Sequence, residues 1–153
     1  SIYKYIRLRN ISYKEYEKIV KEKLRSMNFT GKTIIDYPFA NGWLDDFHGI
    51  HYNSTNIKYY EHERRNSNYI YSASCHTAND INECNKKYFD FILLSPLHES
   101  YSEYNILGWK KFSELCIKSN NPTLALGGIS LSGLDYSDCI NNNGFGISGV
   151  RNV

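Results

Sequence analysis

The sequence predicts an α/β protein built around a parallel sheet. Strand-like and helix-like segments alternate along the chain, and successive strands are spaced by roughly 20 residues, as in β/α units. The short, largely apolar runs at 91–94 and 122–126 fit strands that are buried on both faces. Open doubly wound sheets and closed barrels both satisfy this pattern. No G-x-G-x-x-G sequence follows the first strand, which weakens the dinucleotide-binding version of the open sheet.

The first half of the chain supplies three of the predicted strands. Residues 3–9 alternate in polarity and predict a strand, and the Ser12 to Glu15 spacing of a capping box then predicts the start of a helix. Residues 32–36 predict a second strand and residues 47–51 a short third one. The following segment, 53–68, is polar and weakly patterned.

The second half supplies four more strands, with a helix between each neighbouring pair. The predicted strands are 68–75, 89–94, 122–126 and 144–150, and the predicted helices are 80–87, a segment around 109–116, and a short one within 131–140. This regular alternation favours a parallel sheet.

Length and composition indicate one globular domain over residues 1–153. The chain is 41% hydrophobic and 22% charged, with a formal net charge of +2. This balance disfavours a nucleic-acid partner, and no apolar run approaches about 18 residues, so we expect no membrane span. We recognise no signal peptide, and we expect the four cysteines, which form no C-x-x-C pair, to be reduced and buried thiols of a cytoplasmic protein.

Five motifs follow one another in the second half. They are Ser72-Ala-Ser-Cys-His-Thr77, Phe89-Asp-Phe-Ile-Leu-Leu-Ser-Pro96, Leu107-Gly-Trp109, Leu124-Ala-Leu-Gly-Gly-Ile129 and Gly144-Phe-Gly-Ile-Ser-Gly-Val-Arg151. This series resembles the thiamine phosphate synthase/TenI superfamily, and it is most similar to the thiamine phosphate synthase-like domain fused to MutT-type Nudix hydrolases. In the first half, 6–9 resembles the family's second strand and 49–51 its fourth.

The resemblance implies a TIM-type β/α barrel that lacks the family's first β/α unit. An ordinary barrel of eight units needs about 250 residues, and this chain has 153. The unpaired strand edges of an incomplete barrel favour a homo-oligomer or a fused Nudix domain as partner, and a chain cut from a longer protein is the remaining alternative. In such barrels the site lies at the carboxyl ends of the strands.

The implied activity is that of a thiamine phosphate synthase in thiamine biosynthesis. Such an enzyme couples hydroxymethylpyrimidine pyrophosphate to hydroxyethylthiazole phosphate and releases pyrophosphate. One alternative is a non-catalytic or regulatory domain that binds a phosphate ligand, accessory to a Nudix hydrolase. The other is a TenI-like thiazole tautomerase. Whether the chain is an enzyme therefore stays open at this stage, while a phosphorylated small molecule is the expected ligand in each case.

A phosphate site is predicted after the last two strands. Gly127 and Gly128 directly follow a predicted strand, where glycine lets backbone N–H groups approach an anion closely. Ser148, Gly149 and Val150 lie in the next strand and its end, the usual place for phosphate in barrels. The alternative is a pair of turn glycines without a ligand.

The anion and metal contacts are less complete than in the family. The resemblance implies that Arg9 contacts pyrophosphate, although Asn10 and Ile11 replace the family's Glu and Lys. The alternative is a solvated or ion-paired structural arginine. It also implies a Mg²⁺ site, for which only Asp36 stands in the expected place. Because Mg²⁺ prefers carboxylate oxygens, a single aspartate makes this site weak.

Two residues at the end of the strand 68–75 are further candidates. The resemblance implies that Ser74 contacts substrate near the pyrimidine, and a hydroxyl that both donates and accepts suits a heterocycle. His76 is common in the family. Each has an alternative role in which the side chain only satisfies neighbouring backbone.

The loop after the strand 89–94 carries the remaining candidates. Ser100 and Ser102 match two family hydroxyls that bind pyrophosphate, but Glu103 replaces a lysine and would repel that anion. Pro96 stands where tautomerases have a histidine. His98, two positions further on, is the candidate proton carrier, with an ordinary loop histidine as the alternative.

Overall fold

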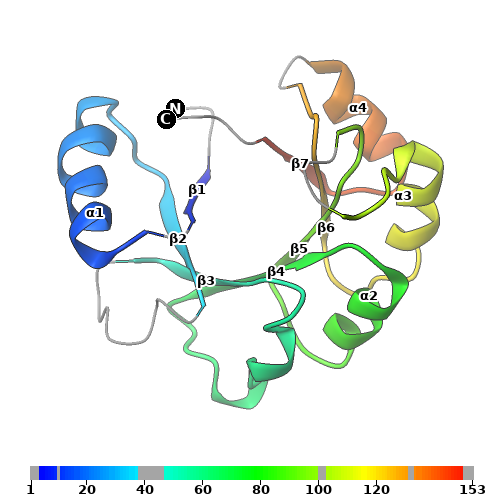
Figure 1. Ribbon diagram of the computed structural model, residues 1–153, viewed down its shortest axis with the longest axis horizontal. Helices are drawn as coiled ribbons and strands as arrows, with labels where there is room; N and C mark the ends of the chain where they lie inside the picture. Colours follow the sequence, from blue (N-terminus) through cyan, green and yellow to red (C-terminus); the bar gives the residue numbers. More distant parts are fainter. Residues whose placement is uncertain (1–3, 10, 38–46, 100–102, 131–132, 150–153) are drawn as a thin grey trace.

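The chain folds into a curled, seven-stranded parallel sheet, as the computed structural model shows (Figure 1). The structure describes residues 4–9, 11–37, 47–99, 103–130 and 133–149. The strands are β1 (Tyr5–Leu8), β2 (Lys32–Asp36), β3 (Gly49–Tyr52), β4 (Ile70–Cys75), β5 (Phe91–Leu94), β6 (Thr123–Leu126) and β7 (Gly146–Ser148). They lie in sequence order and each is parallel to the next.

Helical segments connect the strands on the outer, convex face of the sheet (Figure 1). They are α1 (Tyr13–Lys18), the π-helical continuation η1 (Ile19–Leu24), the 3-10 turns η2 (Ile57–Tyr59) and η3 (His62–Arg64), α2 (Ala78–Asn85), α3 (Gly108–Cys116) and α4 (Gly133–Asn141). The polar stretch predicted at 53–68 thus holds two short 3-10 turns rather than a long helix.

Local sequence signals explain where two of the helices begin. At α1, the Ser12 hydroxyl accepts from the Glu15 backbone N–H, and the Glu15 carboxylate accepts from the Ser12 N–H. Thr77 and Asp80 form the same reciprocal pair at α2. Such a pair satisfies backbone donors that a helix start otherwise leaves unpaired.

The hydrophobic core lies between the sheet and these helices. The larger cluster joins β4, β5 and β6 to α2 and α3, with residues such as Ile92, Leu94 and Phe112 fully buried. A smaller cluster packs Tyr16 of α1 against Ile35 of β2. All four cysteines, Cys75, Cys84, Cys116 and Cys139, are buried free thiols, as predicted.

Three large apolar residues in or next to the helical segments are exposed. Met27 is 60% exposed because the helical segment has already given way to a turn. Leu134 and Ile140 on α4 are 77% and 44% exposed. The buried residue of α4 is instead Cys139, whose small thiol donates to the Gly146 carbonyl at 3.0 Å and lets the helix approach β7.

The sheet is strongly curved, so that strands far apart in the strand order approach each other across its concave face. The ring of Tyr5 on β1 lies 5.7 Å from the ring of Phe91 on β5, although three strands separate them in the sheet. Among the described residues, β1 and β7 each pair with one neighbour, so the sheet forms a half-barrel. This architecture confirms the predicted α/β fold of the TIM-like kind.

Candidate functional site

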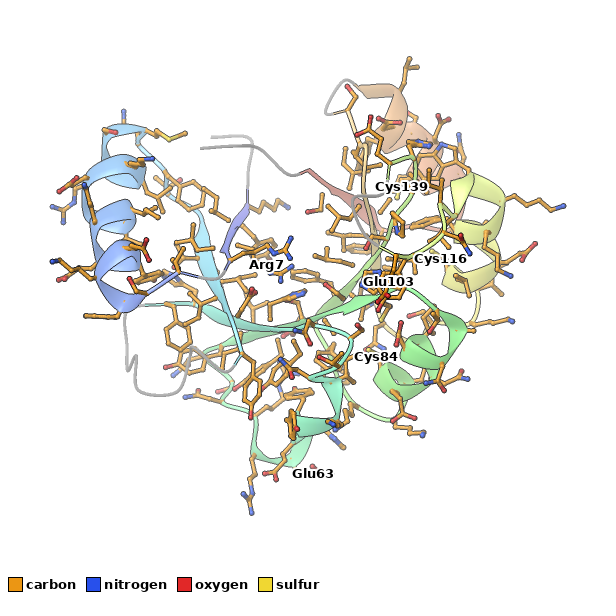
Figure 2. The ribbon with its side chains drawn as sticks, viewed as in Figure 1. Arg7, Glu63, Cys84, Glu103, Cys116 and Cys139 are labelled. Atoms are coloured by element: carbon orange, nitrogen blue, oxygen red, sulfur yellow. The ribbon has the colours of Figure 1, made fainter. Side chains whose placement is uncertain are left out.

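A polar layer lines the concave face in the middle of the sheet. Strand register places Arg7, Asp36 and His51 on this face, because side chains two residues apart on a strand share a side. The Nε of Arg7 donates to the Asp36 carboxylate at 2.6 Å. Figure 2 shows Arg7 on this inner side, whereas Cys84, Cys116 and Cys139 lie on the side toward the helices.

His51 connects β3 to β4 through two hydroxyl groups. Its Nδ1 shares a hydrogen bond with the Ser72 hydroxyl at 2.8 Å, and its Nε2 shares one with the Ser74 hydroxyl at 2.7 Å. The imidazole is only 1% exposed. These bonds fix the ring in one orientation on the inner face.

Burial and charge keep this imidazole neutral. Desolvation lowers the pKa of His51 well below its ordinary 6.5, and the positive charges of Arg7 and Arg9 lower it further. A neutral imidazole has one donor and one acceptor nitrogen, so the hydroxyls of Ser72 and Ser74 must take complementary roles. Both ring nitrogens of His51 are engaged in these bonds, so the hydrogen-bonding capacity that remains in the trio lies on the serine hydroxyls, of which Ser74 is the more exposed.

Arg9 lies at the carboxyl end of β1 and is exposed. Arg9 lies two positions after Arg7, with Leu8 between them, so both side chains belong to the inner face. Its charge lowers the pKa of Arg7 as well as that of His51, although burial is the main cause for Arg7. Arg9 thus lies at the rim of the half-barrel, and its contact with an anion stays a prediction.

The described residues do not fit a magnesium site. Asp36 lies on the inner face at the end of β2, but its carboxylate is the ion-pair partner of Arg7 and only 12% of its side chain is exposed. No group of three or more His, Cys, Asp or Glu side chains in the described ranges could hold a metal ion. No step of the chemistry below is therefore assigned to Mg²⁺.

The predicted phosphate residues lie at neighbouring strand ends. Gly127 and Gly128 follow β6 with φ of 105° and 67°, a left-handed backbone that favours glycine. Ser148 ends β7 opposite Leu126, and the exposed Gly149 follows it. The glycine pair also packs closely against the loop that follows β5, since a Cβ on Gly128 would lie 2.8 Å from Glu99 Cγ.

The two candidates at the end of β4 make different contacts. His76 Nδ1 bonds the Ser95 carbonyl at 2.9 Å, and its ring stacks on Tyr104 at 3.9 Å. These contacts match the structural alternative stated for His76. The Ser74 hydroxyl shares its hydrogen bond with His51, and its contact with substrate stays a prediction.

The candidate proton carrier, His98, contacts residues of the helix layer. Its ring meets Trp109 of α3 edge-to-face at 5.4 Å, and its Nε2 lies 3.7 Å from an Asp135 carboxylate oxygen on α4. The Asp135 carboxylate also accepts from the Ser130 backbone N–H at 2.6 Å. These contacts hold His98 between the starts of two helices.

Three predicted site residues, Ser100, Ser102 and Val150, lie outside the described residues. Glu103 is described and exposed in the same loop.

Apart from this site, a cavity of about 240 Å³ lies between η1 and the start of β2, lined by Leu24, Gly31 and His48 among others. It is at the amino ends of the strands, opposite the candidate site.

Sequence reasoning missed Arg7, Ser72 and His51 as site residues. The signal was available in the strand period, because Arg7 precedes Arg9 by two residues and Ser72 precedes Ser74 by two. His51 was harder to find, since its role depends on β3 pairing with β4 in one register. That register comes from the packing of the whole sheet.

Comparisons with known proteins agree with this architecture. A family model described as thiamine monophosphate synthase (TMP-TENI) matches residues 5–152. The curated protein "Putative thiamine-phosphate synthase 2" of Aquifex aeolicus (strain VF5) is 27% identical over 148 residues, which cover 95% of this chain and 78% of that protein.

Solved structures share the fold. Thiamine phosphate pyrophosphorylase from Pyrococcus furiosus superposes with a TM-score of 0.67 at 15% identity, covering 96% of this chain and 72% of that one. FabK from Thermotoga maritima gives a TM-score of 0.70 at 11% identity, covering 92% of this chain and 47% of the other. At these identities the likeness shows the fold alone.

Fold and site together define a TIM-like β/α half-barrel with a polar layer on its inner face. No helix in the described ranges has the length and hydrophobicity that crossing a bilayer requires. The family model covers nearly the whole chain, and the chain belongs to the thiamine monophosphate synthase family.

Proposed function

We propose that this protein is a thiamine phosphate synthase-like transferase. It couples hydroxymethylpyrimidine pyrophosphate to hydroxyethylthiazole phosphate and releases pyrophosphate. The observation that carries the proposal is the neutral His51 held between the Ser72 and Ser74 hydroxyls on the inner face. This set suits an uncharged pyrimidine, and it lies beside two arginines that suit the phosphorylated end of the same molecule.

In this reaction the residues of the chain bind the two substrates and orient them toward each other. The bond between the pyrimidine methylene carbon and the pyrophosphate oxygen breaks, and the thiazole nitrogen forms a new bond to that carbon. Arg9, at the rim, faces the charge that gathers on the leaving pyrophosphate. Ser74, whose hydroxyl His51 orients, holds the pyrimidine, while the glycine pair after β6 and the end of β7 hold the thiazole phosphate.

A second candidate is a domain that binds a phosphate ligand without turning it over. Two observations favour it: the Asp36 carboxylate is held by Arg7, and Glu103 stands in the loop that follows β5. The tautomerase has less support, because His98 contacts Trp109 and Asp135 rather than the polar layer. An attached Nudix hydrolase, a homo-oligomer and a cytoplasmic location stay predictions from the sequence.

Product formation separates the two candidates. The folded chain is incubated with hydroxymethylpyrimidine pyrophosphate, thiazole phosphate and Mg²⁺, and thiamine phosphate is assayed against a heat-denatured control. We expect turnover that falls by about tenfold or more in His51→Gln, because a buried hydrogen-bonded group is replaced. The exposed Arg64→Gln variant, on η3, should match the wild type. Thiazole phosphate binding without turnover would instead establish the binding domain.

A further inference from the structure

The cavity at the amino ends of the strands lies apart from the candidate site. It has a volume of about 240 Å³ and lies between η1 and the start of β2. An apolar cavity of about 150 Å³ is enough for a benzene ring, so this one has room for a ring and one further group. Its size therefore suits a small molecule.

The backbone beside this cavity has an uncommon conformation. The segment η1 is π-helical, and beyond its end the Phe29 N–H donates to the Leu24 carbonyl at 2.9 Å, again across five residues. Turns of π-helix are rare and frequently occur at functional sites. At Gly31, a Cβ would lie 2.6 Å from Phe29 Cε2, so glycine allows the Phe29 ring to pack there. Leu24, Phe29 and Gly31 all line the cavity, so these backbone features form part of its wall.

The larger side chains of the wall are apolar. Val20, Leu24 and Phe29 line the cavity, and Leu24 is buried while the other two are partly buried. An apolar group that replaces water against such walls is itself removed from solvent, which is favourable. Ligand pockets commonly combine walls of this kind with a few polar groups that orient the ligand. The walls therefore favour a ligand with a compact apolar body.

The polar part of the lining includes Thr33 and His48. The Thr33 backbone N–H donates to the Nδ1 of His48 at 3.2 Å, so we assign the proton of the neutral imidazole to Nε2. The Thr33 hydroxyl lies 3.1 Å from the same Nδ1 and 3.1 Å from the Tyr16 hydroxyl. Among the described residues, both hydrogen bonds of the His48 side chain are made through Nδ1, which leaves the Nε2–H as a donor for water or a ligand.

Arg25 gives the cavity a positive charge. It is exposed, and none of the described residues that line the cavity is acidic. A guanidinium presents paired N–H donors that match the two oxygens of a carboxylate. Together with the Nε2–H of His48, Arg25 offers donors to an anionic group, while the apolar walls suit the rest of the molecule.

We propose that this cavity is a second binding site, which takes a small carboxylic acid with a compact aromatic or branched apolar body. The body packs against Val20, Leu24 and Phe29, and the carboxylate accepts hydrogen bonds from Arg25 and His48. This site does not depend on the proposed function, because it lies at the opposite ends of the strands.

Titration of benzoate and of 3-methylbutanoate into isotope-labelled protein tests the proposal, with backbone amide shifts followed by NMR. For at least one of these acids we expect saturable shifts at Leu24, Gly31 and Thr33, with a Kd of about 1 mM or tighter. No saturable shift up to about 10 mM with either acid, or shifts confined to the carboxyl ends of the strands, overturns the proposal.

Two further probes separate the two parts of the recognition. Acetate carries the charge without the apolar body, and benzyl alcohol carries the ring without the charge. Each should bind at least about tenfold more weakly than the better of the two acids, because each lacks one set of contacts. Equal affinity for acetate would contradict the role of the apolar walls, and equal affinity for benzyl alcohol would contradict the role of Arg25.

A pair of charge variants assigns the carboxylate contact. Arg25→Gln should weaken binding of the acid by about threefold to tenfold, since an exposed charge-assisted contact is removed. Lys23→Gln removes the same charge from an exposed residue of η1 that is not among the described lining residues, and it should leave the affinity unchanged. Equal losses in the two variants would refute a specific contact with Arg25.

A pair of size variants assigns the position of the apolar body. Val20→Phe fills the cavity and should abolish binding of the acid. Ile19→Phe enlarges the neighbouring, partly buried side chain, which is not among the described lining residues, and should bind as the wild type does. Thermal unfolding checks that both variants are folded, and the exposed Arg25→Gln decides if Val20→Phe is not. Undiminished binding in folded Val20→Phe would refute the proposed site.

Discussion

His51 illustrates how burial sets the chemistry of one side chain. An exposed histidine titrates near neutrality, but this imidazole is 1% exposed and lies near two arginines, so the pKa is lowered and the ring stays neutral. Neutrality lets it share hydrogen bonds with Ser72 and Ser74 at the same time. The arginine charges on and next to β1 thus help to keep His51 in the neutral form that bonds to the two serines of β4.

This burial predicts a dependence of stability on pH. The folded state resists protonation of His51, whereas the unfolded chain takes up a proton near its ordinary pKa of 6.5. Between the two pKa values the unfolded state binds more protons, so stability rises with pH there. Above about pH 6.5 the contribution is complete, and it is lost as the pH falls toward the folded pKa, by up to about 1.4 kcal/mol per pH unit.

Urea unfolding at several pH values between about 5 and 8 measures this effect. His51→Gln retains polar groups but cannot titrate, so the difference in unfolding free energy between wild type and variant should shrink as the pH falls. The other histidines are common to both proteins and cancel. A difference that stays constant over the whole range would show that His51 is not buried and neutral.

At the scale of elements, the turn after β6 combines two demands on glycine. Gly128 has a φ of 67°, and a Cβ there would lie 2.8 Å from Glu99 Cγ and 3.0 Å from His98 Cβ. We predict that Gly128→Ala lowers the free energy of unfolding by about 1–3 kcal/mol, through backbone strain and the close approach of this loop.

Two other glycines provide matched controls for that prediction. Gly108 has a φ of 63° with open space round a Cβ, so Gly108→Ala should show the strain alone. Gly133 begins α4, also with open space, and Gly133→Ala should be neutral or stabilising by up to about 1 kcal/mol. Thermal or urea unfolding ranks the three variants, and equal effects in all three would contradict the assigned packing.

Local signals explain which elements were predictable. Both helix starts with reciprocal caps follow from residues three apart, and β2 matches its predicted range because Gly31 and the apolar run bound it. The buried residue of α4 was not predictable, since Cys139 is selected by how closely the helix meets β7. The same contrast between local and long-range information holds for the site. Ser74 was predicted from its place at a strand end, whereas the Arg7–Asp36 pair depends on the pairing of two strands.

At the scale of the whole molecule, the residues of the sheet are most deeply buried in its central strands. Five of the six residues of β4 are buried, whereas no residue of β1 or β7 is fully buried in the described structure. Each of these outer strands pairs with one neighbour among the described residues. Stability is therefore expected to decline from the middle of the sheet to its two edges.

Amide hydrogen exchange measures that gradient. We expect the slowest exchange in β4 and β5 and the fastest strand exchange in β1 and β7. Protection of β1 and β7 equal to that of β4 would show that another strand or a second copy covers the edges. Repeating the measurement at several protein concentrations separates those two cases.

The alternation of strands and helices was enough to predict the fold class, because it depends on local composition. The curl that brings Tyr5 to Phe91 was not predictable in that way, since it arises from twist and packing over the whole sheet. Membership of the family adds the expected ligand chemistry.

The most direct test is to map where a phosphorylated ligand binds. Thiazole phosphate is titrated into isotope-labelled protein, and backbone amide shifts are followed by NMR. The account predicts that the largest shifts fall at the carboxyl ends of β6 and β7, at Gly127, Gly128 and Gly149. Shifts concentrated round Leu24 and Gly31, at the cavity by the amino ends of the strands, or no shifts at all, would contradict it.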